Sequence, residues 1–228
     1  MKKPSKRTKS NLALVDRTKT YDITEAVDLL KKTANTKFVG SVEVHVNTNI
    51  DPKKTDQLIR GSVSLSHGTG KKLRVAAFVP ESKEEDAKAA GATIVGGEDL
   101  IKKIKETEAT DFDVAVADTS LMPKLASIAK VLGTRGLMPN PKTGTVGDNI
   151  SAMIKEIAGG KINFKNDDTA NVHVIIGKTD FDADKIIENF KQFLKALQSA
   201  KPTGIKGTFL STITMNSTMG PGIRVKIQ

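Results

Sequence analysis

The chain has 228 residues, enough for one or two domains, and its net charge of +10 predicts a polyanionic partner such as nucleic acid. Without cysteine it has no disulfide, zinc knuckle or iron–sulfur cluster, and its three scattered histidines give little support for metal catalysis. No apolar run approaches the roughly 20 residues that span a bilayer, and no signal peptide is recognisable, so we expect a cytoplasmic protein that binds no membrane, metal or cofactor.

The N-terminal part begins with basic residues and continues with a predicted helix. Five Lys and Arg lie within residues 2–9, and we expect this segment to be a mobile tail until it meets phosphate. Asp22 and Glu25 have the spacing of a capping box, in which each side chain bonds a backbone N–H at the start of a helix. They predict a short amphipathic helix that extends to about Lys31.

A strict alternation of apolar and polar residues over 42–50 predicts a strand. Val44 lies on its apolar face, whereas Glu43 and His45 lie on the opposite, polar face. Such alternation is typical of an antiparallel sheet with one face on the core and the other in water. Residues 51–52, Asp and Pro, end the strand.

The middle of the chain alternates between strands and helices. Its strands are short, continuous apolar runs, which indicates burial on both faces and therefore a parallel, doubly wound sheet. In chain order the predicted elements are strand 73–79, helix 81–90, strand 93–95, helix 98–107, strand 114–117 and a helix with its apolar residues at 121, 125, 128 and 132.

The last part of the chain contains the longest predicted helix and several strands. Apolar residues recur every three or four positions from Ile186 to Leu197, and residues 201–202, Lys and Pro, close the helix. In chain order the predicted elements are strand 162–164, turn 166–168, strand 172–176, helix 182–200, strand 208–216 and strand 223–227.

The excess positive charge lies at the two ends of the chain. Residues 1–67 contain 13 basic and 7 acidic residues, residues 160–228 contain 10 and 6, and residues 68–159 contain 13 of each. Because both ends show periodic strands and helices, we predict that they fold together as one α+β domain with an antiparallel sheet and two helices on one face. The neutral segment is then an inserted α/β domain. A neutral domain flanked by two basic arms is the simpler alternative.

The glycine-rich segment 67–71 is the first candidate for a nucleotide site in such a domain. A P-loop requires Gly where this chain has Leu65 and Ser or Thr where it has Lys72, and the dinucleotide fingerprint requires Gly in place of Leu73. The glycines also precede a strand instead of following it. We therefore interpret the segment as a hinge between domains and disfavour an enzyme that uses the middle domain.

The second glycine-rich segment, 132–147, contains four glycines, two prolines, Arg135 and Lys142. It has no pair of nucleophile and base. Its backbone amides and two cations suit phosphate groups, but a purely structural connection between two helices has the same composition. The residues alone leave both interpretations open.

The segment 132–147 resembles the signature of the bacterial large-subunit ribosomal protein L one family. The resemblance extends over essentially the whole chain. Further ordered matches lie at 36–38, 43–45, 50–52, 60–68, 96–98, 164–167, 206–210 and 217–221. It implies a discontinuous first domain of residues 1–67 and 160–228 and an inserted, Rossmann-like domain of three layers at 68–159.

The resemblance also implies a function without catalysis. A member of this family is a structural constituent of the large ribosomal subunit, binds a helical junction of large-subunit rRNA, and forms the mobile stalk near the tRNA exit site, where it assists release of deacylated tRNA. Many bacterial members repress translation of their own mRNA. We thus expect rRNA, tRNA, the protein's own mRNA and the ribosome as partners, and a monomer outside the ribosome. The alternative is an RNA-binding translational regulator that acts away from the ribosome.

The resemblance assigns RNA-binding roles to residues in both ends of the chain. Phe38 matches an aromatic that packs on RNA, and Glu43 matches an acid that accepts from a 2′-hydroxyl or a base, because a carboxylate repels phosphate. Residues 218–220 match a loop that approaches the RNA backbone. The complete predicted set is Lys37, Phe38, Ser41, Glu43, Lys165, His173, Thr208, Ser211, Thr218, Met219 and Gly220.

Several of these residues also have purely structural interpretations. Taken alone, the sequence favours Phe38 as a core residue, since aromatic side chains favour burial, and only the resemblance reverses this. Met219 is also explained as the filler of a gap in the core. Glu43 would serve to balance a nearby lysine. His45 and His173 fit partly exposed positions of a sheet. These alternatives make the exposure of each side chain the deciding observation.

Overall fold

The structure is a computed structural model that describes residues 5–205 and 207–226, and its chain divides into two compact units. The first unit combines Met1–Gly70 with Ile162–Gln228, and the second is Lys71–Lys161. The two boundaries between the units lie three and two residues after the positions expected from the sequence. The first unit contains an antiparallel sheet and the second a parallel sheet. The chain is therefore of mixed α and β structure.

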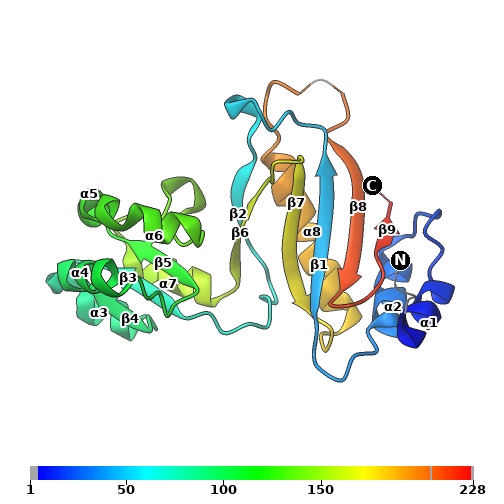
Figure 1. Cartoon of the computed structure of the whole chain (residues 1–228), viewed down its shortest axis with the longest axis horizontal. Coiled ribbons are helices and arrows are strands. Elements are labelled where there is room, and N and C mark those ends of the chain that lie inside the picture. Colours follow the sequence, from blue (N-terminus) through cyan, green and yellow to red (C-terminus); the bar gives the residue numbers. More distant parts are fainter. Residues whose placement is uncertain (1–4, 206, 227–228) are drawn as a thin grey trace. The chain divides into compact units, whose positions relative to one another are not determined.

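The first unit is built on a four-stranded sheet, called the main sheet below, in the order β7-β1-β8-β9 (Figure 1). Its strands are β1 (Ser41–Thr48), β7 (Asn171–Lys178), β8 (Leu210–Ser217) and β9 (Ile223–Val225). β1 pairs antiparallel with β7 on one side and β8 on the other. The alternation predicted for β1 is confirmed, because every second side chain from Val42 is buried.

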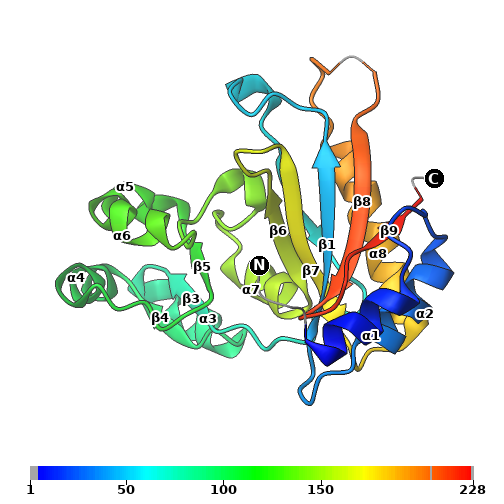
Figure 2. The same cartoon turned by 45° about the vertical axis from the view of Figure 1, so that its right-hand side comes forward.

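Two helices, α2 (Ile23–Thr33) and α8 (Ala183–Ser199), cover one face of the main sheet (Figure 2). Leu30 of α2 and Phe193 of α8 are fully buried in the core that they form with the apolar face of the strands. Because the apolar side chains face these two helices, the polar side chains of β1 and β7 point to the opposite face, which neither helix covers. We call it the open face.

The N-terminus differs from the predicted mobile tail. Residues Lys6–Leu14 form helix α1, which Ser5 caps by accepting a bond from Thr8 N. Asn11 is buried and anchors the helix: its side chain donates to Thr33 O at 2.9 Å and exchanges bonds with the Asn35 amide. An isolated nine-residue helix is marginal in water, so these amide contacts hold it in place. The tail residues 2–4 lie outside the described residues.

The predicted capping box is only partly correct. Asp22 is the N-cap residue of α2, but its side chain makes no capping bond to the helix. Its carboxylate pairs instead with the Lys226 ammonium at 3.1 Å, across to the end of β9. The helix begins where the spacing predicts, because its apolar face packs on the sheet.

The prediction that residues 162–164 join the main sheet is wrong. They belong to β6 (Lys161–Lys165), which pairs only with β2 (Arg60–Ser64) in a separate two-stranded sheet. Phe164 of β6 contacts Phe193 edge to face, with ring centroids 5.8 Å apart. A Cβ atom at Gly61 would lie 2.7 Å from the Phe164 ring, so the pairing requires glycine there.

The second unit has a three-stranded parallel sheet in the order β4-β3-β5. Its elements are β3 (Val75–Phe78), α3 (Glu84–Ala89), β4 (Ile94–Gly96), α4 (Glu98–Thr107), β5 (Val114–Ala117), α5 (Met122–Leu125), α6 (Ala129–Thr134) and α7 (Ile150–Ala158). α3 and α7 bury one face, and α4 to α6 bury the other, which gives three layers.

Short 3-10 turns complete the chain. The turns are Thr55–Gln57, Glu81–Lys83, Thr119–Leu121, Ala126–Ile128 and Pro141–Thr143. The segment 121–132, predicted as one helix, is interrupted by such a turn, and Pro123 lies at the start of α5. Within the described part of the chain, no helix is long and apolar enough to cross a membrane.

Candidate nucleic-acid interface

Three loops meet at the end of the main sheet where β1 begins and β7 and β8 end. Thr218 N donates to Ser41 O at 3.0 Å, and Ser41 N donates to Thr218 Oγ1 at 2.9 Å. Gly40 N donates to Thr179 Oγ1, and Thr179 N returns a bond to Gly40 O, both at 3.0 Å. Segments that are far apart in the sequence thus form one surface, which we call the loop end.

Large apolar side chains are exposed at the loop end. Phe38 and Val39 are each 55% exposed, and Met219 is 69% exposed. These values exclude Phe38 as a core residue and Met219 as a filler of the core. Exposed apolar groups that gather in one place mark an interaction site more often than they serve stability.

The turn after β8 holds Met219 outward. Met219 has a left-handed φ of 65°, and Gly220 N closes the turn by donating to Ser217 O at 2.8 Å. A Cβ atom at Gly220 would lie 2.3 Å from Ser217 Oγ, so this glycine is needed by the turn itself. The Thr218 hydroxyl is engaged with the Ser41 backbone. It therefore positions the turn.

The positive charge of the chain belongs almost entirely to the first unit. Its residues include 22 Lys and Arg against 13 Asp and Glu, a net charge of +9, whereas the second unit has 14 against 13. Lys37 is exposed at the loop end, and Lys178 Nζ donates to Ser41 Oγ at 3.1 Å. The Asn11–Asn35 contact places the basic helix α1 beside the same loop.

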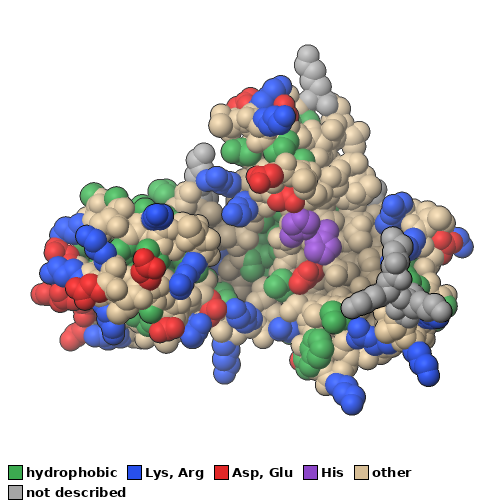
Figure 3. All heavy atoms as spheres, viewed as in Figure 1, with side chains coloured by type: hydrophobic (Ala, Val, Ile, Leu, Met, Phe, Trp, Pro, Cys, Tyr) green, Lys and Arg blue, Asp and Glu red, His purple; other side chains and the backbone are tan. Residues whose placement is uncertain are grey.

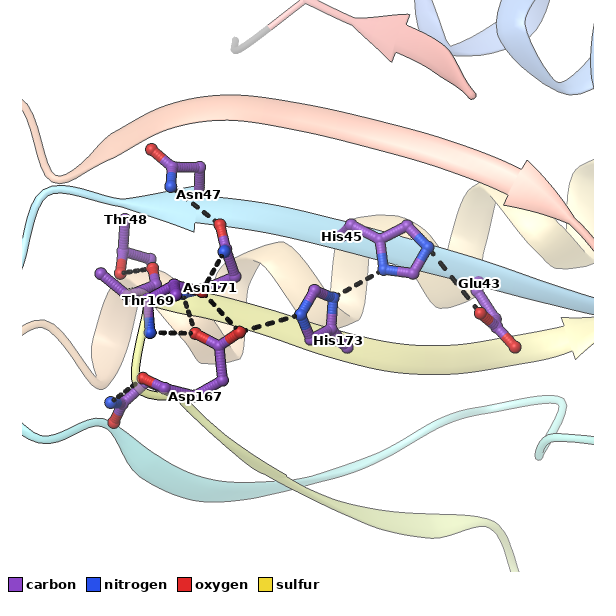
Figure 4. Close-up of polar contacts among 10 residues, drawn as sticks. Glu43, His45, Asn47, Thr48, Asp167, Thr169, Asn171 and His173 are labelled. Atoms are coloured by element: carbon purple, nitrogen blue, oxygen red, sulfur yellow. Dashed lines mark hydrogen bonds and ion pairs between the residues drawn. The ribbon is translucent and has the colours of Figure 1, made fainter. Parts of the chain in front are cut away.

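The open face of the main sheet carries a connected polar network (Figure 4). At its centre His45 Nδ1 lies 2.7 Å from His173 Nδ1, across paired positions of β1 and β7. His45 Nε2 lies 2.7 Å from Asn216 Oδ1 on β8, and 3.7 Å from the Glu43 carboxylate. Farther along β1, Asn47 Nδ2 donates to the side-chain oxygen Oδ1 of Asn171 on β7.

Asp167 organises the turn that leads into β7. Its carboxylate accepts from Asn171 N at 2.7 Å, from Thr169 N and Oγ1, and from His173 Nε2 at 3.3 Å. The backbone N–H of Asn171 is the largest cause that lowers the pKa of Asp167, followed by the Thr169 and His173 bonds, against the opposing effect of desolvation. A carboxylate held ionised in this way fixes the His173 ring.

The structure divides the predicted RNA-binding residues into separate groups. Lys37, Phe38, Ser41, Thr218, Met219 and Gly220 lie together at the loop end, and Glu43 and His173 lie on the open face. Ser211 is at the opposite end of β8, roughly 20 Å from the loop end, in a register shift of the β1–β8 pairing. Thr208 is exposed just before that strand, and Lys165 lies on β6.

Sequence reasoning missed several polar side chains of the open face. The sequence predicts His45 as an ordinary sheet position and Asn47 only as a residue of the polar face, and it predicts no role for Asn171 or Asn216. They share the alternate positions of Glu43 and His173, which is a usable signal. The strand register that brings them together was not available from the sequence.

The second unit has a pocket but no candidate metal site among its described residues. A pocket beyond the ends of its strands is lined by Gly97 and by charges of both signs, and a Glu98–Lys124 ion pair lies within it. Among the residues described, no group of three or more His, Cys, Asp or Glu is suited to hold a metal.

Comparison with known proteins shows the family of this chain. Residues 30–221 match the model of the ribosomal protein L1p/L10e family. The large ribosomal subunit protein uL1 of Thermosipho melanesiensis is 48% identical over 99% of this chain and 97% of its own length. The proteins of the same name from Saccharopolyspora erythraea and Streptococcus gordonii are 49% and 48% identical, over 94% and 99% of their lengths and at least 99% of this chain. The chain therefore belongs to the ribosomal protein L1p/L10e family.

Proposed function

We propose that the protein is a non-catalytic constituent of the large ribosomal subunit in the cytoplasm and that its first unit binds large-subunit rRNA. The observation that carries this proposal is the loop end, where three distant segments meet and two of them expose Phe38, Val39 and Met219 on a unit of charge +9. Apolar side chains suit the faces of bases, and cations suit phosphates. The relatives are named large ribosomal subunit proteins, which agrees with this partner.

Affinity and selectivity would come from different groups. The cations neutralise phosphates and give binding its salt dependence. Helical RNA hides its base edges in a deep groove, so selectivity must rely on shape and 2′-hydroxyl groups. The turn at 218–220, held by Ser41, supplies a fixed shape, and Glu43 on the open face supplies an acceptor.

We further propose the finer roles that the family implies. The RNA target is a helical junction, and the protein forms a mobile stalk near the tRNA exit site and assists release of deacylated tRNA. It also binds its own mRNA and represses its translation. The near-neutral second unit would add few phosphate contacts to these roles. Co-sedimentation with large subunits separates this proposal from a regulator that acts away from the ribosome.

The test is the binding of Thr218 variants to a short large-subunit RNA junction and to a random duplex, across a salt series. Thr218→Val removes the hydroxyl that Ser41 N donates to, and Thr218→Ser keeps it. We expect the Val variant to lose roughly tenfold in selectivity, about one hydrogen bond left unmade, with an unchanged salt slope. The Ser variant should behave as the wild type.

Circular dichroism melts of all three proteins show whether the variants are folded. The proposal fails if the wild type binds the junction and the duplex equally at every salt concentration. In that case the positive unit is a generic surface for polyanions.

A further inference from the structure

Two imidazole rings touch in the middle of the open face. His45 of β1 and His173 of β7 are opposed in the antiparallel register, and their Nδ1 atoms lie 2.7 Å apart with ring centroids at 4.9 Å (Figure 4). A separation of 2.7 Å is that of a short hydrogen bond and requires a hydrogen between the two nitrogens. The question is which nitrogens carry the hydrogens.

The outer nitrogen of each ring faces an oxygen that accepts. His173 Nε2 lies 3.3 Å from the Asp167 carboxylate, which the Asn171 and Thr169 bonds keep ionised. His45 Nε2 lies 2.7 Å from Asn216 Oδ1, while the Nδ2 of that amide donates to a backbone carbonyl at 3.5 Å. Both Nε2 atoms therefore carry a hydrogen.

With both Nε2 atoms protonated, two neutral rings have no hydrogen left for the contact between their Nδ1 atoms. A neutral imidazole has one N–H, so two neutral rings that both donate from Nε2 would direct two lone pairs at each other. Moving the hydrogen of either ring to Nδ1 would direct an Nε2 lone pair at an oxygen, which is equally unfavourable. All the contacts are satisfied only when the two rings hold three protons between them.

We propose that His45 and His173 share a proton between their Nδ1 atoms, so that the pair carries one positive charge. The Glu43 and Asp167 carboxylates, at 3.7 and 3.3 Å, flank the pair and stabilise this charge. In Figure 3 acidic side chains lie on either side of the two adjacent imidazoles.

The remaining neighbours of the pair bring few charges. β8 has no ionisable side chain, and on β7 only Lys178 does besides His173, with its Nζ on Ser41 Oγ at the strand end. Lys165 and Asp168 are exposed on either side of the Asp167 turn. β1 has no Lys or Arg either, and the exposed Arg224 of β9 lies on the same face two strands away from His45. The shared proton is therefore the positive charge nearest to the centre of the open face.

The consequence for binding rests on the proposed function. RNA on this surface stabilises a positive charge, so bound RNA would hold the shared proton more tightly, and by linkage the proton would strengthen RNA binding. The charged pair predominates at lower pH. RNA affinity is therefore expected to fall as the pH rises and the proton leaves, by about fivefold for one charge near a phosphate.

The proton count is tested directly on the free protein by ¹H–¹⁵N spectra with labelled histidine. We expect both Nε2 atoms to be protonated at neutral pH and one proton to be shared by the Nδ1 atoms. His67, which pairs with Glu188 at 2.9 Å elsewhere in the unit, is the internal reference. An unprotonated Nε2 in either ring of the pair overturns the proposal.

The linkage is tested by the affinity for the RNA junction from about pH 5 to about pH 8, the range in which histidine changes charge. Wild type and His67→Asn should lose affinity alike as the pH rises, whereas His45→Asn and His173→Asn should change little. Equal pH dependence in all four proteins overturns the linkage. Loss of selectivity by wild type at every pH would instead refute the proposed function, so the two failures are distinguishable.

Discussion

Exposure separates Phe38, which we propose to contact RNA, from Phe193, which stabilises the core. Phe38 is 55% exposed, whereas Phe193 is fully buried against Phe164. Phe38→Ala should change the free energy of unfolding by less than about 0.5 kcal/mol, and weaken RNA binding by about 1–3 kcal/mol, the range for a base stacked on an aromatic ring. Urea unfolding and RNA titrations measure the two quantities.

The matched control is Phe193→Ala, which should cost about 3–5 kcal/mol of stability because it opens a cavity in the core. A Phe38 variant that unfolds as easily as the Phe193 variant would return Phe38 to the core. Unchanged RNA affinity would remove it from the interface.

Residue types at the interface could be predicted, but several of their roles could not. The resemblance identified Thr218 and Gly220, and their chemistry suggested direct contact with RNA. The structure shows that the Thr218 hydroxyl is used by Ser41 and that Gly220 avoids Ser217 Oγ. Such roles depend on neighbours that are far away in sequence, so composition and spacing do not contain them.

Elements with strong periodicity were predictable, and elements held by tertiary contacts were not. β1, α4 and α8 follow their apolar patterns closely. By contrast, β2 has no alternation and exists because Gly61 lets it approach Phe164, and α1 depends on the amide contacts of Asn11. Local patterns carry no information on these long-range contacts.

The ion pair between Asp118 and Lys83 in the second unit should make the stability of that unit depend on pH. Asp118 follows β5, is 4% exposed, and accepts from Lys83 Nζ at 2.7 Å and from Ser120 N and Oγ. The Lys83 bond, followed by the Ser120 bonds, lowers the pKa of Asp118 from 3.8 to about 2. An acid with a lowered pKa stabilises the fold above its unfolded pKa, and this contribution is lost as the pH falls through the folded value.

Asp118→Asn should therefore lower the stability of the second unit by about 2 kcal/mol at pH 7 and by almost nothing near pH 2. Hydrogen exchange of the β3 and β5 amides in the full chain measures this difference. Asp99→Asn is the control, since its side chain is 99% exposed and its contact with Lys102 is 3.8 Å long. The same loss from Asp118→Asn at both pH values would contradict the assignment.

At the scale of the molecule, charge and periodicity indicate two units, but they do not predict the order of the strands in the main sheet. The two chain ends share a net charge of +9, and both show strand and helix patterns. The order β7-β1-β8-β9 places a strand from the first end between two from the last. Such pairing depends on which strands bury their apolar faces together, and many orders satisfy the same patterns.

The partition of charge leads to a prediction about salt. Lys6 and Lys9 lie on α1, which Asn11 fixes beside Asn35, two residues before Lys37. These lysines are exposed and form no ion pair within the described residues. If they contact phosphates, replacing all three by Gln should reduce the salt slope of RNA binding by about 2 to 3, since each contact contributes about 0.7–0.9.

The matched control replaces Lys103, Lys105 and Lys130 of the second unit, which are equally exposed and free of ion pairs among the described residues. Both variants lose three charges, so any effect of net charge alone is the same in each. A slope that falls only in the first variant places the RNA on the first unit. A slope that falls equally in both would mean that RNA follows the total charge of the molecule, and that the concentration of charge in one unit has no part in binding.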